Sequence, residues 1–191
     1  MSMFKRFMTP DAPQADAAPV APPPPAGSAA ETATARQIVA RLDAMPPAEA
    51  RYLACFAYVM SRAAQADLKV SEEETALMQR FAVEYGGLDE SQAVLVIGMT
   101  KIQATIEGAT EDYVVTREFR DISTIEQRIQ LLRCCFAIEA ADGTINAEEA
   151  SVVNEIAREL DVERADLNRV REEFHEQLSS VQAVRRAAEG G

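Results

Sequence analysis

The sequence has few of the residues on which several kinds of protein depend. Its 191 residues include no tryptophan, one histidine, and three cysteines without CxxC spacing. This scarcity excludes a disulfide-stapled mini-protein. Long apolar runs are also missing, because the densest one, residues 52–60, has about half the length that a membrane helix needs. We therefore expect no transmembrane segment.

Positive charge is scarce as well. The chain has 19 Lys and Arg against 31 Asp and Glu, which gives a formal net charge of -12. Such a surface repels nucleic acid, so we expect no nucleic-acid partner. The hydrophobic share of 48% is large enough for one substantial core. It excludes a collagen-like chain and a wholly disordered one.

The first 31 residues differ in composition from the rest. Prolines interleaved with alanine favour extended polyproline II and supply no core, so we expect residues 1–31 to form a disordered arm. The tip of the arm combines apolar and basic side chains: Phe4, Lys5, Arg6 and Phe7. This pattern suits peripheral contact with a membrane or a partner, and the alternative is an ordinary frayed terminus. The apolar stretch is too short for a signal peptide.

From about residue 32 onward the apolar residues recur with helical periodicity, and no strand-like alternation is present. The sequence predicts an all-α fold, with a compact domain of seven or eight helices over residues 32–180 and a flexible tail over 181–191. The predicted helices cover residues 33–44, 48–65, 72–85, 90–106, 112–120, 124–140, 147–160 and 164–179. Gly98 lies inside one of them at a cost of about 1 kcal/mol relative to alanine, so we expect a close helix crossing there.

Two segments of the chain repeat at a shift of 75 residues. Residues 66–74 (ADLKVSEEE) align with residues 141–149 (ADGTINAEE), and the helix that follows keeps the same apolar stripe. Each copy therefore reads as a helix, a tight acidic turn and a second helix. Neither pair of helices can bury its stripe alone, so the two copies are expected to make one domain.

The repeated pattern A-D-x-x-[VI]-x-x-E-E, with DYVVTREF (112–119) and EQRIQLL (126–132) between the copies, resembles the tellurite-resistance TerB family. The resemblance covers about residues 36–174. It implies a compact seven- or eight-helix fold, divalent-metal binding through the acidic turns, and a role in metal or envelope stress exerted through protein partners. Some membrane co-chaperones carry a related domain before a J domain, but this chain has no His-Pro-Asp motif.

The carboxylates of the two turns are the candidate metal ligands: Asp67, Glu73, Glu74, Asp142, Glu148 and Glu149. The second turn reproduces only the later half of an EF-hand loop, because Ile138 and Ala140 stand where acidic ligands belong. A cation would therefore need oxygens from both copies, or several waters. Ca²⁺ or Mg²⁺ is favoured over zinc, since no His or Cys lies near either turn.

The same carboxylates have a purely structural explanation. Ser71 and Glu74 have the spacing of a capping box, and Asn146 with Glu149 is a near variant. Carboxylates in the first turn of a helix also gain about 0.3–1 kcal/mol each from the helix dipole. Under this alternative the turns bind no metal and the domain is a structural interaction module. The sequence leaves both alternatives open.

The remaining chemistry-bearing residues predict no enzyme. Cys55, Cys134 and Cys135 lie in apolar helices, as is typical of core residues in a reducing cytoplasm, and His175 falls near a helix end as a surface residue. No nucleophile and base are paired, although a carboxylate-based hydrolase is a third alternative. Some arginines could dock an acidic partner or complement helix dipoles: Arg164, Arg169, Arg171, Arg185 and Arg186.

These patterns together predict a soluble, non-enzymatic module in the cytoplasm that works through protein partners, with the membrane periphery as an alternative location. We expect no cofactor other than the candidate cation, and no small-molecule substrate. An acidic domain is also a poor receptor for the tellurite oxyanion, so we expect no direct binding of that anion.

Overall fold

The structure, a computed structural model, describes residues 29–64, 72–104, 112–141 and 143–189. Over these residues the fold is all-α, as predicted, with nine α-helices and a short 3-10 helix. The elements are α2 (Ala29–Asp43), α3 (Pro47–Ala63), α4 (Glu72–Glu84), α5 (Glu90–Ala104), α6 (Asp112–Ile122), α7 (Ile125–Glu139), α8 (Ala147–Glu159), α9 (Arg164–Glu173), η2 (His175–Gln177) and α10 (Ser179–Glu189).

The predicted arm and its Phe4, Lys5, Arg6 and Phe7 tip lie outside the described residues, except that residues 29–31 already belong to α2. No helix in the described ranges combines the length and the apolarity needed to cross a membrane.

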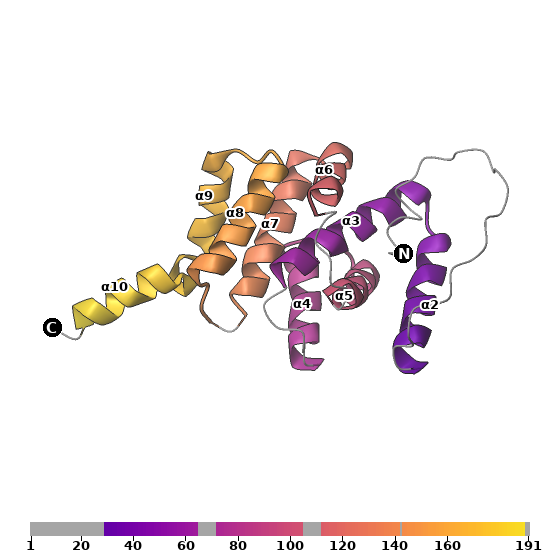
Figure 1. The fold of residues 1–191 in the computed structure, drawn as a ribbon, viewed down its shortest axis with the longest axis horizontal. Helices are drawn as coiled ribbons and strands as arrows, with labels where there is room; N and C mark the ends of the chain where they lie inside the picture. Colours follow the sequence, from indigo (N-terminus) through magenta and orange to yellow (C-terminus); the bar gives the residue numbers. More distant parts are fainter. Residues whose placement is uncertain (1–28, 65–71, 105–111, 142, 190–191) are drawn as a thin grey trace.

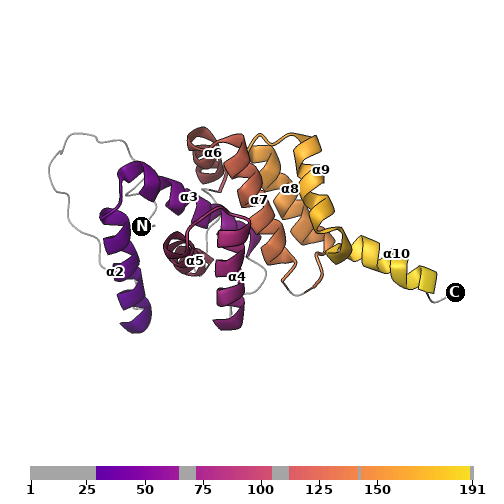
Figure 2. The same ribbon diagram turned by 180° about the vertical axis from the view of Figure 1, so that it is seen from behind.

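Helix α3 is the centre of the hydrophobic core. Every residue from Leu53 to Ala63 is buried, and the helix packs against α5, α6, α7 and α8. Phe56 of α3 meets Phe119 of α6 edge to face, with ring centroids 5.9 Å apart. Helix α2 lies at one end of the molecule and α10 projects from the other (Figures 1 and 2). The core therefore joins α3 to helices that lie far from it in the sequence.

Two helical hairpins, α3–α4 and α7–α8, correspond to the predicted repeat. The second helix of each hairpin packs against the first helix of the other, α4 against α7 and α8 against α3. On the apolar stripe of α4, Met78 is buried, and so is its counterpart Val153 on α8. This exchange of partners explains why neither hairpin can bury its stripe alone.

The helix crossing expected at Gly98 is confirmed. A Cβ at Gly98 of α5 would lie 3.0 Å from Cδ1 of Ile38 on α2. Ile38 is buried in the core, so α2 is held against the body through this contact. The absence of a side chain at Gly98 is what allows the close approach.

The C-terminal part of the chain differs from its prediction. One helix was expected over 164–179 and a flexible tail over 181–191, whereas α9 ends at Glu173 and a separate helix, α10, covers Ser179–Glu189. The break occurs because Phe174 is buried, stacked on Phe136 with ring centroids 5.7 Å apart. Leu178 then pairs with Ile145 in the one isolated β-bridge of the described residues. Alanine-rich sequence then resumes a helix, as its high helix propensity favours.

Candidate functional site

A polar hollow of about 240 Å³ lies where the two hairpins meet, and we call it the polar pocket. It is lined by the C-terminal ends of α3 and α7 and by the start of α8, which lie on the same side of the molecule in Figure 1. Because α3 and α7 are the first helices of the two hairpins, each acidic turn follows one of these helix ends in the chain. The lining residues are Arg62, Ala63, Glu139, Asn146, Glu148, Glu149 and Val152.

Arg62 brings a buried positive charge to the pocket. Its side chain is 8% exposed, and its Nη1 donates to Oγ1 of Thr116 at 2.6 Å and to Oε2 of Glu159 at 2.5 Å. The side chain of Glu159 is itself 10% exposed. Buried charges are costly unless they are paired and hydrogen-bonded, so this pair ties α3 to α6 and α8.

Glu139, the last residue of α7, adds a buried carboxylate that is 7% exposed. Both Glu139 and Arg62 affect the pKa of Cys135, which lies one turn earlier on α7. The pKa of the Cys135 thiol is raised to about 12, mainly by burial and also by the charge of Glu139, while Arg62 acts in the opposite direction. Both charged groups therefore act on the same water-poor region of the core.

The start of α8 is built as a capping box around the pocket. Oδ1 of Asn146 accepts from the backbone N–H groups of Glu148 at 2.8 Å and Glu149 at 3.0 Å. In return, the backbone N–H of Asn146 donates to Oε2 of Glu149 at 2.8 Å. The predicted near variant of a capping box is therefore confirmed, and one carboxylate oxygen of Glu149 is already engaged in it.

The six predicted metal ligands have different places in the structure. Glu148 and Glu149 line the pocket together. Glu73 and Glu74 belong to the first turn of α4, but their side chains lie outside the described part, and so do Asp67 and Asp142 entirely. Among the described residues, no three His, Cys, Asp or Glu side chains are grouped closely enough to hold a metal ion.

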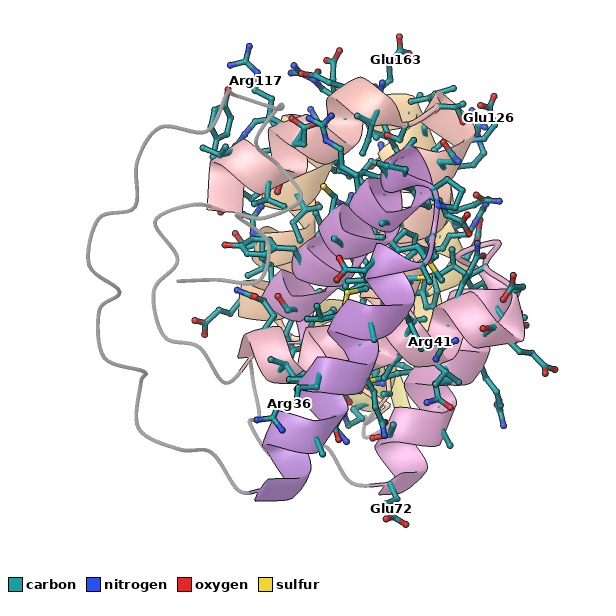
Figure 3. The ribbon with its side chains drawn as sticks, turned by 90° about the vertical axis from the view of Figure 1, so that its right-hand side faces the viewer. Arg36, Arg41, Glu72, Arg117, Glu126 and Glu163 are labelled. Atoms are coloured by element: carbon teal, nitrogen blue, oxygen red, sulfur yellow. The ribbon has the colours of Figure 1, made fainter. Side chains whose placement is uncertain are left out.

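Several charged side chains away from the pocket face solvent. Arg117, Glu126 and Glu163 point outward from their helices in Figure 3. Many arginines singled out from the sequence have local partners: Arg169 pairs with Asp166 at 2.8 Å and Arg185 with Glu176 at 3.1 Å. These are the contacts of a solvated surface.

The cysteines and the histidine lie as expected from the sequence. All three thiols are buried, and burial raises the pKa of Cys55 to about 12 and that of Cys134 well above its ordinary value. His175 lies exposed on η2. No cysteine of the described structure is therefore placed as an accessible nucleophile.

The sequence did not single out Arg62, Glu139 and Glu159, the buried charges at and below the pocket. A signal was present, because Arg62 and Glu139 each follow an apolar stretch of helix just before an acidic turn. A charged residue on a buried helical face usually marks a pair or a site. The partners of Arg62 lie 54 and 97 residues away, so no local spacing could identify them.

The duplicated hairpins and the acidic pocket between them define a small all-helical module with a polar site at the junction of its two halves. The family model described as "Tellurite resistance protein TerB" matches residues 52–172, which include most of α3 and all of α4, α7 and α8. The chain therefore belongs to the TerB family. No curated protein and no solved structure matches the chain significantly.

Proposed function

We propose that this TerB-family chain is a non-catalytic module that binds Mg²⁺ or Ca²⁺ weakly at the polar pocket and acts through protein partners in metal or envelope stress. The observation that carries the proposal is that α3 and α7 both end at the polar pocket. The helices that lead into the two acidic turns end beside the same carboxylates. A cation there would draw oxygens from both copies of the repeat, as half of an EF-hand loop requires. The proposed ligand set is Asp67, Glu73, Glu74, Asp142, Glu148 and Glu149.

The charges of the pocket support a cation as the ligand. Three carboxylates and one guanidinium line it, and the guanidinium of Arg62 is already paired with Glu159. The excess negative charge attracts a cation and repels an oxyanion such as tellurite. Oxygen donors also suit hard cations. Mg²⁺ fits the described residues best, because it keeps several waters and needs only one or two carboxylates.

A second candidate is a structural interaction domain without metal, and one specific observation favours it. Asn146 and Glu149 already satisfy each other's backbone amides in the capping box of α8. First-turn carboxylates would then serve only the helix terminus and its dipole. The two candidates differ in the role of the Glu149 charge. The first candidate needs this charge to bind a cation, whereas the second needs Glu149 only to cap α8.

The variant Glu149→Gln separates these candidates. A glutamine at this position can still accept from the Asn146 amide, as Gln127 does from Thr124 at the start of α7, with a distance of 2.8 Å. The variant therefore keeps the capping box and removes one charge. Glu126→Gln is the matched control, because it removes an exposed first-turn carboxylate of α7 that is not part of the pocket.

The measurement is the thermal midpoint with and without millimolar Ca²⁺, Mg²⁺ or Zn²⁺. A ligand that binds only the folded state raises the midpoint. We expect Mg²⁺ or Ca²⁺ to raise it in the unmodified chain and in Glu126→Gln, and to raise it much less in Glu149→Gln. No shift with any metal in the unmodified chain would reject the cation site and leave only the capping role.

The non-catalytic part of the proposal takes account of where the thiols and the histidine lie. The three thiols are buried, and His175 is exposed on η2, which follows α9. We expect a broad hydrolase screen to find no activity that depends on the pocket. Activity that copurifies with the chain and disappears in the Glu148→Gln, Glu149→Gln double variant would contradict this part.

A further inference from the structure

Helix α5 lies in the core over more than half of its circumference. Leu95, Val96 and Ile97 are consecutive and all buried, and helical neighbours point about 100° apart, so these three side chains alone span about 200°. The remaining part of the circumference carries Ser91, Val94 and Gly98, which are spaced i, i+3 and i+7 and so form one stripe. We call this stripe the α5 face.

Helix α2 is seated on the α5 face and contacts it at two points. A Cβ at Gly98 would lie 3.0 Å from Cδ1 of Ile38, and Nη2 of Arg41 donates to the carbonyl of Ser91 at 3.1 Å and to its Oγ at 2.5 Å. Because Ile38 meets Gly98 and Arg41 meets Ser91, α2 runs antiparallel to α5. Figure 3 views the molecule from this end, with α2 in front of the helical body.

The side chains that hold α2 have the spacing of a docked amphipathic helix. Ile38, Leu42 and Met45 stand at i, i+4 and i+7; the first two are buried in the core, and Met45 is half-buried against it. Helices that bind apolar surfaces of other proteins use anchors with this spacing. The contact between α2 and α5 therefore has the form of a partner helix bound within one chain.

Helix α2 covers the α5 face incompletely. Val94 lies on the stripe between Ser91 and Gly98, where α2 makes its two contacts, and it is still 48% exposed. A helix with a larger apolar side chain opposite Val94 would bury surface that α2 leaves in water, and this burial favours the larger occupant.

Helix α2 is also held less firmly than the helices of the core. Only two of its described side chains are buried, whereas every residue of α3 from 53 to 63 is buried. Pro46 and Pro47 separate α2 from α3 and have no N–H to donate, so the two helices are not one hydrogen-bonded unit. Elements with few buried apolar contacts open at a lower free energy than the whole fold. Residues 52–172, which the family model matches, include α5 and not α2.

We infer that the α5 face is a docking site for an amphipathic helix of a partner protein, and that α2 occupies this site within the chain and competes with the partner. The present occupant specifies the chemistry of the partner helix. It has apolar anchors at i, i+4 and i+7, a basic side chain at i+3 that reaches Ser91, and a bulky apolar side chain opposite Val94. This inference goes beyond the proposed function, because the α5 face shares no residue with the lining of the polar pocket and needs no cation.

The probe is a fluorescein-labelled synthetic peptide of residues 29–45, which carries the three anchors. The full-length release variant Ile38→Ala, Leu42→Ala loses both buried anchors of its own α2. The apparent affinity of a ligand falls with the fraction of chains in which its site is free, so we expect the release variant to bind the peptide about tenfold more tightly than the unmodified chain in fluorescence anisotropy. A peptide with alanine at both anchor positions is expected not to bind.

Hydrogen exchange shows whether only α2 is released. We expect the α2 amides of the release variant to lose protection while those of α3 keep it. If the α3 amides also lose protection, Arg41→Ala takes the place of the release variant, because it removes the hydrogen bonds to Ser91 and no buried side chain. It is then expected to bind the peptide more tightly than the unmodified chain does.

Two exposed valines locate the bound peptide. Added to the release variant, Val94→Glu is expected to weaken peptide binding about tenfold or more, and Val114→Glu on α6, at a site that is 61% exposed, to leave it unchanged. Equal binding by the unmodified chain and the release variant, or binding that Val94→Glu does not weaken, would overturn the inference. So would a release variant that keeps its α3 amides protected and binds no peptide. A dimer of the unmodified chain in light scattering that the peptide converts to monomer would also overturn it, because a second copy would then be the occupant.

Discussion

Replacing Arg62 tests the buried charges that support the pocket. Arg62→Met removes the guanidinium and leaves the Glu159 carboxylate, 10% exposed, without this partner. Breaking a buried ion pair by removing one member costs about 3–5 kcal/mol, because the remaining charge stays in a medium of low polarity. Methionine keeps most of the apolar contacts of the arginine stem, so lost packing contributes little. We expect the free energy of unfolding to fall by this amount.

The assay is urea unfolding followed by circular dichroism, with a double-mutant cycle. The double variant Arg62→Met, Glu159→Met removes both charges and is expected to lose less stability than Arg62→Met alone. Arg133→Met is the control, since Arg133 pairs with Glu173 at the surface and should cost about 1 kcal/mol or less. A double variant that loses as much stability as the two single variants added together would show that Arg62 and Glu159 do not stabilise each other.

Three further predictions concern packing, capping and pH. Gly86→Ala should cost about 1–3 kcal/mol in urea unfolding, because its Cβ would lie 2.5 Å from the Ala82 carbonyl oxygen; an unchanged midpoint would contradict this contact. Thr124→Ala should cost about 1 kcal/mol and Thr124→Ser much less, since serine keeps the cap of α7. The folded-state pKa of Cys135, about 12, exceeds the ordinary 9.0, so its contribution to stability is complete below pH 9 and declines up to pH 12, by at most about 1.4 kcal/mol per pH unit. Cys135→Ala should flatten that decline.

Local sequence patterns predicted most of the helical fold. Apolar periodicity located the helices to within a few residues, and the 75-residue shift identified the two hairpins. Gly98 predicted a helix crossing because a missing side chain inside an apolar helix has few other uses. The helix positions depend on neighbours within one or two turns of the chain, which is the range that periodicity samples.

Features that depend on distant partners could not be predicted in this way. The break between α9 and α10 comes from the pairing of Leu178 with Ile145 and from the burial of Phe174 against Phe136. Alanine-rich composition at the C-terminus is compatible with a flexible tail or with a helix, and the bonds of Gln182 to the turn favour the helix. Tertiary contacts therefore decided the structure where propensity was ambiguous.

The candidate site was predicted only in part, for the same reason. Glu148 and Glu149 were identified from the repeated acidic turn, and both line the pocket. Arg62 and Glu139 were not predicted, because the acidic-turn pattern that identified the other residues does not include charges inside helices. Their importance comes from burial, which only the packing of α3 against α7 and α8 establishes.

Mn²⁺ tests most directly the proposal that both halves of the repeat contribute to one cation site. Mn²⁺ prefers oxygen ligands as Mg²⁺ and Ca²⁺ do, and it broadens the NMR signals of nearby nuclei. We expect substoichiometric Mn²⁺ first to broaden the amide signals of residues 146–149 together with those of residues 62–64, and excess Mg²⁺ to restore both sets. Broadening that begins at scattered surface carboxylates such as Glu163, or that spares residues 62–64, would contradict a site shared by the two halves.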